Sequence, residues 1–481
     1  MARPVARGAR TAVAGCCALL TLVSACDASP PTGQPEGFAD DLALPLAVDL
    51  DPDPHVLEVD LRASVTELEL SPGKKTAAWT YGGTLPGPTL RLTQGDRLRV
   101  HFTNDLPEAT TIHFHGIRGP VEMDGAVPHS QDPVPPGGTF DYDLVVPDAG
   151  LFWYHPHQAS AKQLGFGLYG ALVVDPATPD PAELGDEVLL VLSDIALDDD
   201  GALLPPDSGG DLATAFGREG TTILVNGRAR PRLFARSGAR QRWRIVNAAK
   251  SRYFQLDLGG QPLHRIGADF GRLEAPVDSD RIVVLPGGRA DVLVEPKGTP
   301  GATVPLTWVP YDRGFGSTEY RDQETMMDVT LVGPTVTAPA LPADLGGDVA
   351  TPIDTSGATP VDIHLTQAND ADGKLVLGID GVPYDQAVPI AATVGETQVW
   401  TVTNEMAWAH PFHLHGFFFQ ELEPDGSPKE PVEWRDTVDV PIDGSMRFAV
   451  HYDNRPGMWM YHCHILDHAD AGMMGMVDVS R

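Results

Sequence analysis

The segment Tyr461-His462-Cys463-His464 holds the residues of this chain with the most definite chemistry. It places a thiol directly between two imidazoles, and His468 and Met473 follow shortly after it. Successive side chains of an extended strand point to opposite faces, so we expect His462 and His464 to share one face and Cys463 to occupy the other. One strand is therefore predicted to serve two metal centres.

The sulfur and nitrogen atoms around Cys463 suit a copper ion that transfers electrons. Such a site combines two imidazoles, a thiolate and a weak axial thioether, and His468, Cys463 and Met473 supply all but one imidazole. We expect His410 to supply the missing one. A buried Cys flanked by histidines by chance would explain this spacing poorly.

Paired histidines recur elsewhere in the chain. The pattern His-X-His occurs at His113 and His115, His155 and His157, His413 and His415, and His462 and His464. On a strand each pair projects two imidazoles from one face, which lets a rigid sheet present paired ligands to a metal cluster. The other histidines lack this spacing, and we interpret them as structural or solvent-facing: His55, His101, His129, His264, His364 and His451.

The elements that must position these residues are predicted to be strands. Short stretches of alternating apolar and polar residues are punctuated by Gly, Pro and Asp, and long helical periodicity is scarce. A Gly followed by an Asn nine residues later recurs in three similar stretches, 95–104, 238–247 and 395–404. We therefore expect an all-β chain of three tandem Greek-key β-sandwiches. Their predicted limits are 46–178, 186–335 and 350–481.

The first 25 residues predict export. Three arginines precede an apolar run from Thr11 to Ala25, which is too short to span a bilayer but suits a signal peptide. The run ends in Leu22-Val23-Ser24-Ala25-Cys26, which resembles a bacterial lipobox, so we expect Cys26 to be lipidated and 26–45 to form a flexible tether. The expected location is the bacterial cell surface or periplasm, with membrane contact only through the anchor. An ordinary signal peptide cleaved nearby is the alternative.

Charge and cysteine content narrow the classes of partner. The formal net charge is −32, and such a surface repels nucleic acid, which we exclude as a partner. Once Cys16 and Cys17 leave with the signal and Cys26 is lipidated, Cys463 is the sole free thiol. Exported proteins usually use cysteines for disulfides, so a single free Cys favours metal ligation.

The four histidine motifs, their order and the three tandem domains resemble the multicopper oxidases, the family of laccases, bacterial cuprous oxidases and ascorbate oxidase. The resemblance covers essentially the mature chain and implies cupredoxin-like domains, of which the second binds no copper. It implies four copper ions, with the type 1 ion bound by His410, Cys463, His468 and axial Met473. The type 2 ion would be bound by His113 and His413, and the type 3 pair by His115, His155, His157, His415, His462 and His464.

The resemblance also implies a mechanism. A reducing substrate gives one electron at a time to the copper at Cys463, the electrons pass to His462 and His464, and the cluster reduces O₂ to water. Asp124, nine residues after His115, matches a family position that supports proton delivery. Many bacterial relatives carry Glu at the position of Ala469, so this chain departs from the pattern there. Asp467 or Asp470 is the expected substitute.

The sequence leaves the reducing substrate open. Substrate would approach the edge of His410 or His468, where we expect Glu405 and Asp436 to accept a phenolic proton or hold a metal cation. The absence of a long insert rich in Met and His favours a laccase-like enzyme for phenols or aromatic amines. Oxidation of Cu(I), Fe(II) or Mn(II) in copper tolerance is the alternative. A surface lipoprotein that sequesters copper without catalysis is a third.

Overall fold

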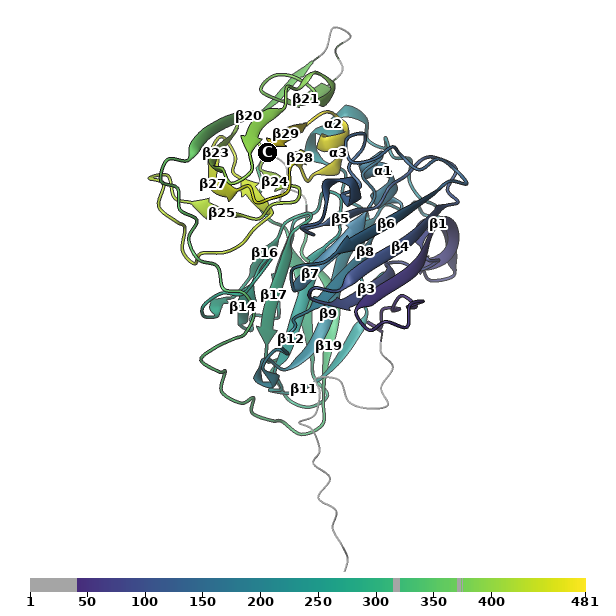
Figure 1. Cartoon of the computed structure of the whole chain (residues 1–481). Coiled ribbons are helices and arrows are strands. Elements are labelled where there is room, and N and C mark those ends of the chain that lie inside the picture. The colour runs from purple at the N-terminus through teal and green to yellow at the C-terminus, as the bar shows by residue number, and fades with distance from the viewer. Residues whose placement is uncertain (1–40, 315–320, 370–372, 374) are drawn as a thin grey trace, which may run out of the picture.

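Six β-sheets make up the chain in the computed structural model, which describes residues 41–314, 321–369, 373 and 375–481. Each sheet takes its strands from one third of the chain, and the thirds lie together as three bodies, purple to blue, teal, and green to yellow in Figure 1. Two sheets per third confirm the predicted all-β class with three tandem sandwiches. The predicted signal, most of the tether and Cys26 lie outside the described residues.

The first domain carries two histidine motifs, with His113, His115 and His155 on its second sheet and His157 just after the strand that ends at His155. Its first sheet has the order β2-β1-β4-β6, with bounds β1 (Val56–Ser71), β2 (Lys74–Tyr81), β4 (Arg97–Asn104) and β6 (Thr139–Val145). Its second sheet has the order β3-β8-β7-β5, with bounds β3 (Gly87–Thr93), β5 (His113–His115), β7 (Gly150–His155) and β8 (Gly170–Asp175). Short helices follow at η1 (Val121–Met123), α1 (Ser160–Gly165) and η2 (Ala182–Leu184).

The second domain has the most extensive pair of sheets. One sheet has the order β10-β9-β12-β17-β14-β15, with bounds β9 (Asp186–Ile195), β10 (Thr222–Val225), β12 (Gln241–Asn247), β14 (Leu263–Gly267), β15 (Val277–Ser279) and β17 (Arg289–Val294). The other has the order β11-β19-β18-β13-β16, with bounds β11 (Arg232–Arg236), β13 (Phe254–Asp257), β16 (Ile282–Val284), β18 (Thr303–Val309) and β19 (Glu324–Val332). The helix α2 (Gly210–Phe216) leaves the sandwich and lies near the third domain (Figure 1).

The third domain carries the remaining histidine motifs and Cys463. One sheet has the order β21-β20-β23-β27-β25, with bounds β20 (Thr359–Asn369), β21 (Leu375–Ile379), β23 (Thr397–Asn404), β25 (Phe419–Leu422) and β27 (Ser445–His451). The other has the order β22-β29-β28-β24-β26, with bounds β22 (Ile390–Thr393), β24 (His410–Leu414), β26 (Thr437–Val440), β28 (Gly457–Cys463) and β29 (Met474–Ser480). Two short helices complete it, η3 (Tyr384–Gln386) and α3 (Leu466–Asp470).

The repeated stretch that ends in Asn forms the same strand three times. β4, β12 and β23 each pair in parallel with the first long strand of their domain and antiparallel with a later strand. The closing Asn is buried in each case, and its side chain binds two carbonyls and one backbone N–H. In the third copy Asn404 donates to the carbonyl of Trp408 (2.7 Å), which fixes the backbone two residues before His410. The repeat thus positions the metal-binding strand.

Each sandwich has its own apolar core, and a further cluster joins all three domains. This shared cluster contains Trp153 from β7, Val246 from β12 and Leu466 from α3. Every residue of β12 is buried, because one face covers the second domain's core and the other lies against the first domain. This shared apolar cluster holds the first and third domains at a fixed separation, as a site built from both domains requires.

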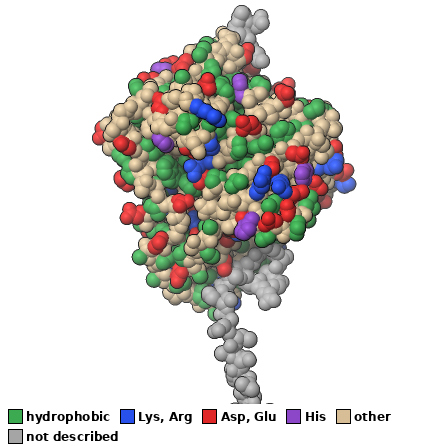
Figure 2. Space-filling view, viewed as in Figure 1, with side chains coloured by type: hydrophobic (Ala, Val, Ile, Leu, Met, Phe, Trp, Pro, Cys, Tyr) green, Lys and Arg blue, Asp and Glu red, His purple; other side chains and the backbone are tan. Residues whose placement is uncertain are grey.

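The outer surface is acidic, with carboxylates spread over the face seen in Figure 2. None of the helices in the described part of the chain has the length and apolar character that a bilayer crossing needs.

Candidate metal centre

The Cys463 site is assembled by one strand pair and one short helix of the third domain. β24 and β28 run antiparallel with Phe412 opposite Cys463, and α3 follows shortly and carries His468. Nδ1 of His410 lies 3.4 Å from Sγ of Cys463 and 3.1 Å from Nδ1 of His468. The latter nitrogen is 3.5 Å from the same sulfur. The structure thus brings together the three donors that the sequence assigned to one ion.

Met473 is fastened to this site through its backbone. Its carbonyl accepts a hydrogen bond from the Cys463 N–H (3.2 Å), and its own N–H donates to the carbonyl of His468 (3.0 Å). Its side chain is buried in the same core as Cys463. Met473 therefore lies beside the Cys463 site.

Buried donors with a free lone pair make the Cys463 site suitable for a cation. Nε2–H of His468 donates to the carbonyl of Ala215 in α2 (3.0 Å), so Nδ1 is the unprotonated nitrogen. Burial, followed by the charge of Arg313, lowers the pKa of His468 to about 3, which keeps the ring neutral. Burial also raises the pKa of the Cys463 thiol, so a bound cation is needed to hold the thiolate. Two nitrogens and one thiolate fit copper.

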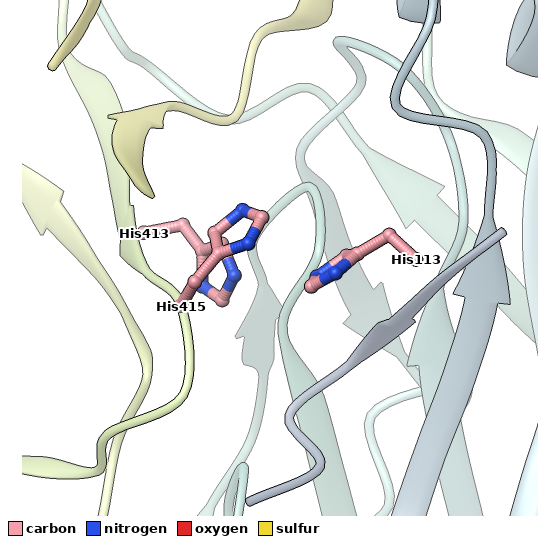
Figure 3. Close-up of side chains that lie close together, drawn as sticks. All are labelled: His113, His413 and His415. Atoms are coloured by element: carbon pink, nitrogen blue, oxygen red, sulfur yellow. The ribbon is translucent and has the colours of Figure 1, made fainter. Parts of the chain in front are cut away.

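Eight histidines from the first and third domains form a second centre, and all are buried. Figure 3 shows His113 facing His413 and His415 across the domain boundary. The rings stack in pairs there, with His113 and His415 4.0 Å apart and His115 and His413 3.9 Å apart between centroids. All four His-X-His pairs of the sequence contribute to this cluster: His113, His115, His155, His157, His413, His415, His462 and His464.

Five of these rings give their Nδ1 proton to the protein. His113 donates to the carbonyl of Asp124 and His155 to that of Pro156. His413 donates to the carbonyl of Asp436 and His462 to that of Cys463. His415 donates to the carboxylate of Asp124. In the neutral form of such a ring the Nε2 atom carries the lone pair. For His113, His155 and His413 the Nε2 atom has no hydrogen-bond partner among the described residues.

These lone pairs converge on one another. Nε2 of His462 lies 3.2 Å from Nε2 of His415 and 3.3 Å from Nε2 of His157. Burial holds the pKa of His415 and His462 well below the usual value and lowers that of His157 to about 3, so the rings are neutral. Neutral imidazole lone pairs that face each other in a dry interior require a cation between them. The residues present therefore fit metal ions.

Two buried carboxylates orient the histidines. Oδ2 of Asp124 accepts from His415 (2.8 Å), and Asp436 lies 3.3 Å from Nε2 of His115. Burial opposes the charged form of each acid. His415 and His113 nevertheless hold the pKa of Asp124 well below its usual range. Arg289 and His115 do the same for the pKa of Asp436. Both acids are therefore ionised and fix the ring orientations.

The second domain contributes residues that the sequence did not indicate. Arg289 donates two hydrogen bonds to Asp436 (2.7 and 2.6 Å), and the carboxylate of Asp269 accepts from the N–H groups of Asp436 and Thr437 (both 3.2 Å). Gly287 has φ +83°, and a Cβ there would lie 2.7 Å from the ring of His464. The second domain holds no histidine of the cluster, yet it supports the cluster from behind. The one available signal was the Pro286-Gly287-Gly288 turn before the strand.

Several predicted residues lie elsewhere than expected. Asp436 is buried against the cluster, where a bulky reducing substrate has no access, and Glu405 is exposed and pairs with His364 (2.9 Å). Asp467 binds Arg218 (2.6 Å), and Asp470 accepts from the N–H groups at the start of α1. Neither of the last two acids has a described contact with a cluster histidine. They fasten α3 to the neighbouring domains.

Comparison with known proteins gives one consistent result. Three sequence models described as multicopper oxidase match residues 63–179, 186–302 and 354–481. The multicopper oxidase MmcO of Mycobacterium tuberculosis is 31% identical over 453 residues, covering 84% of each chain. A laccase of Bacillus subtilis is 26% identical, and the match covers 84% of this chain and 90% of the laccase. A solved multicopper oxidase from Campylobacter jejuni, described as a metallo-oxidase, matches with a TM-score of 0.80 and 28% identity. The match covers 94% of this chain and 96% of the solved chain. These matches confirm the cupredoxin-like fold.

Proposed function

Because the chain belongs to the multicopper oxidase family, we propose that it acts as a laccase-like enzyme on phenols or aromatic amines. Each of four substrate molecules loses one electron and one proton, and one O₂ takes up four electrons and four protons to give two waters. The observation that carries this proposal is the complete donor set, ten buried histidines and one buried cysteine at two adjoining centres. A protein that only stored copper would not require this second, converging cluster.

We assign the ligands as the likeness to the multicopper oxidase family implies. His410, Cys463, His468 and axial Met473 would hold one ion, and His113 and His413 a second. A pair of ions would be held by His115, His155, His157, His415, His462 and His464. The copper ions supply one-electron redox chemistry at Cys463 and O₂ reduction at the histidine cluster. Four copper ions per chain are the expected content, measured by elemental analysis of the loaded protein.

The chain's own residues provide the path between the centres. Cys463 is bonded through the backbone to both His462 and His464, and the Cys463 carbonyl accepts the Nδ1 proton of His462 (2.9 Å). Asp124 contacts His415 and His113, and these contacts support a role for it in passing protons to the cluster. Asp436 is the second carboxylate at the cluster, in contact with His115 and Thr437.

Oxidation of a reduced metal ion is the second candidate. A group of four methionines favours it, since Met460 and Met476 are cross-strand neighbours in one small apolar cluster with Met458 and Met474. Thioethers suit Cu(I). These side chains lie along β28 and β29, on the strand that leads to His462.

Oxygen uptake separates these functions. Copper-loaded protein is supplied with a phenol, an aromatic amine, Cu(I), Fe(II) or Mn(II), and O₂ consumption is recorded beside the copper-free protein. We expect uptake to be fastest with the phenol or the amine and absent without copper. Faster uptake with a metal ion would support the second candidate, and no uptake with any donor would refute an oxidase.

We also propose that the protein works outside the cytoplasm, held by a lipid on Cys26. The apolar run before Cys26 supports this, and Cys463 is the one free cysteine among the described residues. Retention of the protein in the membrane fraction, lost in Cys26→Ala, is the test.

A further inference from the structure

A cavity of about 430 Å³ adjoins the Cys463 site on the side of the second domain. Phe216 and Gly217 form part of its wall, and the preceding residue, Ala215, accepts the hydrogen bond from Nε2 of His468. A Cβ on Gly217 would lie 2.5 Å from the side chain of Ile465, which shows how closely this wall packs on α3. The cavity is therefore separated from a ligand of the electron-accepting site by a single backbone segment.

The walls of this cavity are cationic, although the chain as a whole is strongly acidic. The charged residues that line it are Lys162, Arg218, Lys250, Arg313 and Arg321 against Asp194 and Glu219. Asp194 accepts from Arg252 (2.7 Å), which lies outside the wall. Glu219 lies 3.0 Å from the same guanidinium and also pairs with Arg321 of the wall (2.7 Å). The cavity thus has more positive than negative charge to offer an incoming group.

Lys250 is the residue best placed to receive an anion. It is 8% exposed, and its nearest ion-pair partner in the described chain is Asp467, at 3.6 Å between Nζ and Oδ2. That carboxylate already accepts from the guanidinium and the N–H of Arg218 (2.6 and 2.7 Å). A buried ammonium group held this loosely gains from a further anionic partner.

The remaining wall suits an aromatic ring. Phe166 and Phe216 line the cavity together with Leu204, Pro205 and Pro206. Phe216 also packs on Trp408 with the ring centroids 5.1 Å apart, and Trp408 lies two residues before His410. A flat ring against Phe216 would lie beside the residue that follows Ala215, whose carbonyl accepts from His468, and aromatic contacts of this kind are favourable.

We propose that this cavity binds aromatic carboxylates, and that the reducing substrate is a phenol that carries a carboxylate group. The inference rests on the proposed oxidase function and narrows its substrate class. The carboxylate pairs with Lys250, the ring lies against Phe216, and the electron leaves toward His468 through the hydrogen bond to Ala215. The phenol loses its hydroxyl proton to water in the same step. Cationic substrates, including free metal ions, are disfavoured here by Lys250 and Arg313.

Binding is tested without turnover. A methoxybenzoate, whose phenol oxygen is methylated, and the matching neutral amide are titrated into copper-loaded protein under anaerobic conditions by calorimetry. We expect the carboxylate to bind at least about 10-fold more tightly than the amide, as a charge-assisted contact implies. Lys250→Gln should remove that preference. Lys297→Gln, a change at an exposed lysine paired with Glu295 (3.4 Å), should keep it.

A second pair of variants tests the charge of the cavity without touching Lys250. Ala213 lies in the wall on α2, and Ala213→Glu should weaken carboxylate binding several-fold more than Ala213→Gln, which has the same size and no charge. Equal affinity for acid and amide, or equal effects of the Glu and Gln variants, would overturn the proposal. Oxygen uptake with a neutral phenol is measured separately. If that uptake is normal and the carboxylate preference is absent, the oxidase function stands and this inference fails.

Discussion

Arg289→Met should destabilise the protein strongly, because Arg289 joins all three domains behind the histidine cluster. Its side chain is fully buried and donates to Asp436, to the carbonyl of Leu151 (3.2 Å) and to the carbonyl of Asp269 (3.0 Å). Removing it leaves the carboxylates of Asp436 and Asp269 without their buried cation. Breaking a buried ion pair from one side costs about 3 to 5 kcal/mol, and we expect a loss in that range.

Urea unfolding of the copper-free protein measures this loss. The transition is followed by both near-ultraviolet circular dichroism and tryptophan fluorescence, because a three-domain chain can unfold in more than one step. Arg281→Met is the matched control, since Arg281 is 48% exposed in the same domain and its ion pair with Asp257 (3.1 Å) is on the surface. We expect that control to cost less than about 1 kcal/mol.

The companion variant Arg289→Lys keeps the charge and loses the paired hydrogen bonds, so its cost should be intermediate. Adding Asp436→Asn to Arg289→Met should recover part of the lost stability, because one stranded charge is removed. If Arg289→Met costs no more stability than Arg281→Met, Arg289 does not join the domains as described.

Three further outcomes are expected. Cys463→Ser should abolish the blue absorption and electron entry while most copper stays at the histidine cluster, and retained colour would contradict the ligand assignment. Asp124→Asn keeps an oxygen for hydrogen bonding but loses the charge, so O₂ turnover should fall about 10-fold or more with the blue colour intact; unchanged rates across pH would count against a proton role. Hydrogen bonds from His101 to Asp141 and then Glu58 raise the pKa of His101, so protonated His101 stabilises the fold below about pH 6.5 and that stability is lost as pH rises through the raised value. His101→Gln should therefore lower Tm at about pH 5.5 and have little effect at about pH 9, and an equal effect at both would exclude this linkage.

The histidine motifs could be predicted because their geometry is local. Alternation along β5 already fixes that His113 and His115 leave one face, and a repeated Gly-to-Asn stretch indicates which strand lies at the centre of each sandwich. The third copy even fixes the approach to His410, through the contact of Asn404 with Trp408. Such features depend only on residues close in sequence or on a repeated pattern.

The supporting residues could not be predicted in the same way. Arg289 reaches Asp436 only after two domains have docked, and nothing in the local sequence of either residue indicates the other. Asp436 itself follows Arg435 in a stretch that we expected near the substrate, yet docking buries it against His115. The hydrogen bond from His468 to Ala215 uses a backbone oxygen, which has no sequence signature at all.

The two centres differ in how much of the chain must be in place before they exist. His410, Cys463 and His468 all belong to the third domain, so the donors of that site come from one sandwich, and the second domain adds the Ala215 carbonyl that holds His468. The cluster takes half its histidines from the first domain and half from the third, so it appears only when the two ends of the chain have met. Blue colour of the protein therefore indicates that the third domain is folded, whereas metal bound at the histidine cluster indicates that the domains have assembled. Metal content per chain is then a measure of tertiary maturation as well as of cofactor supply.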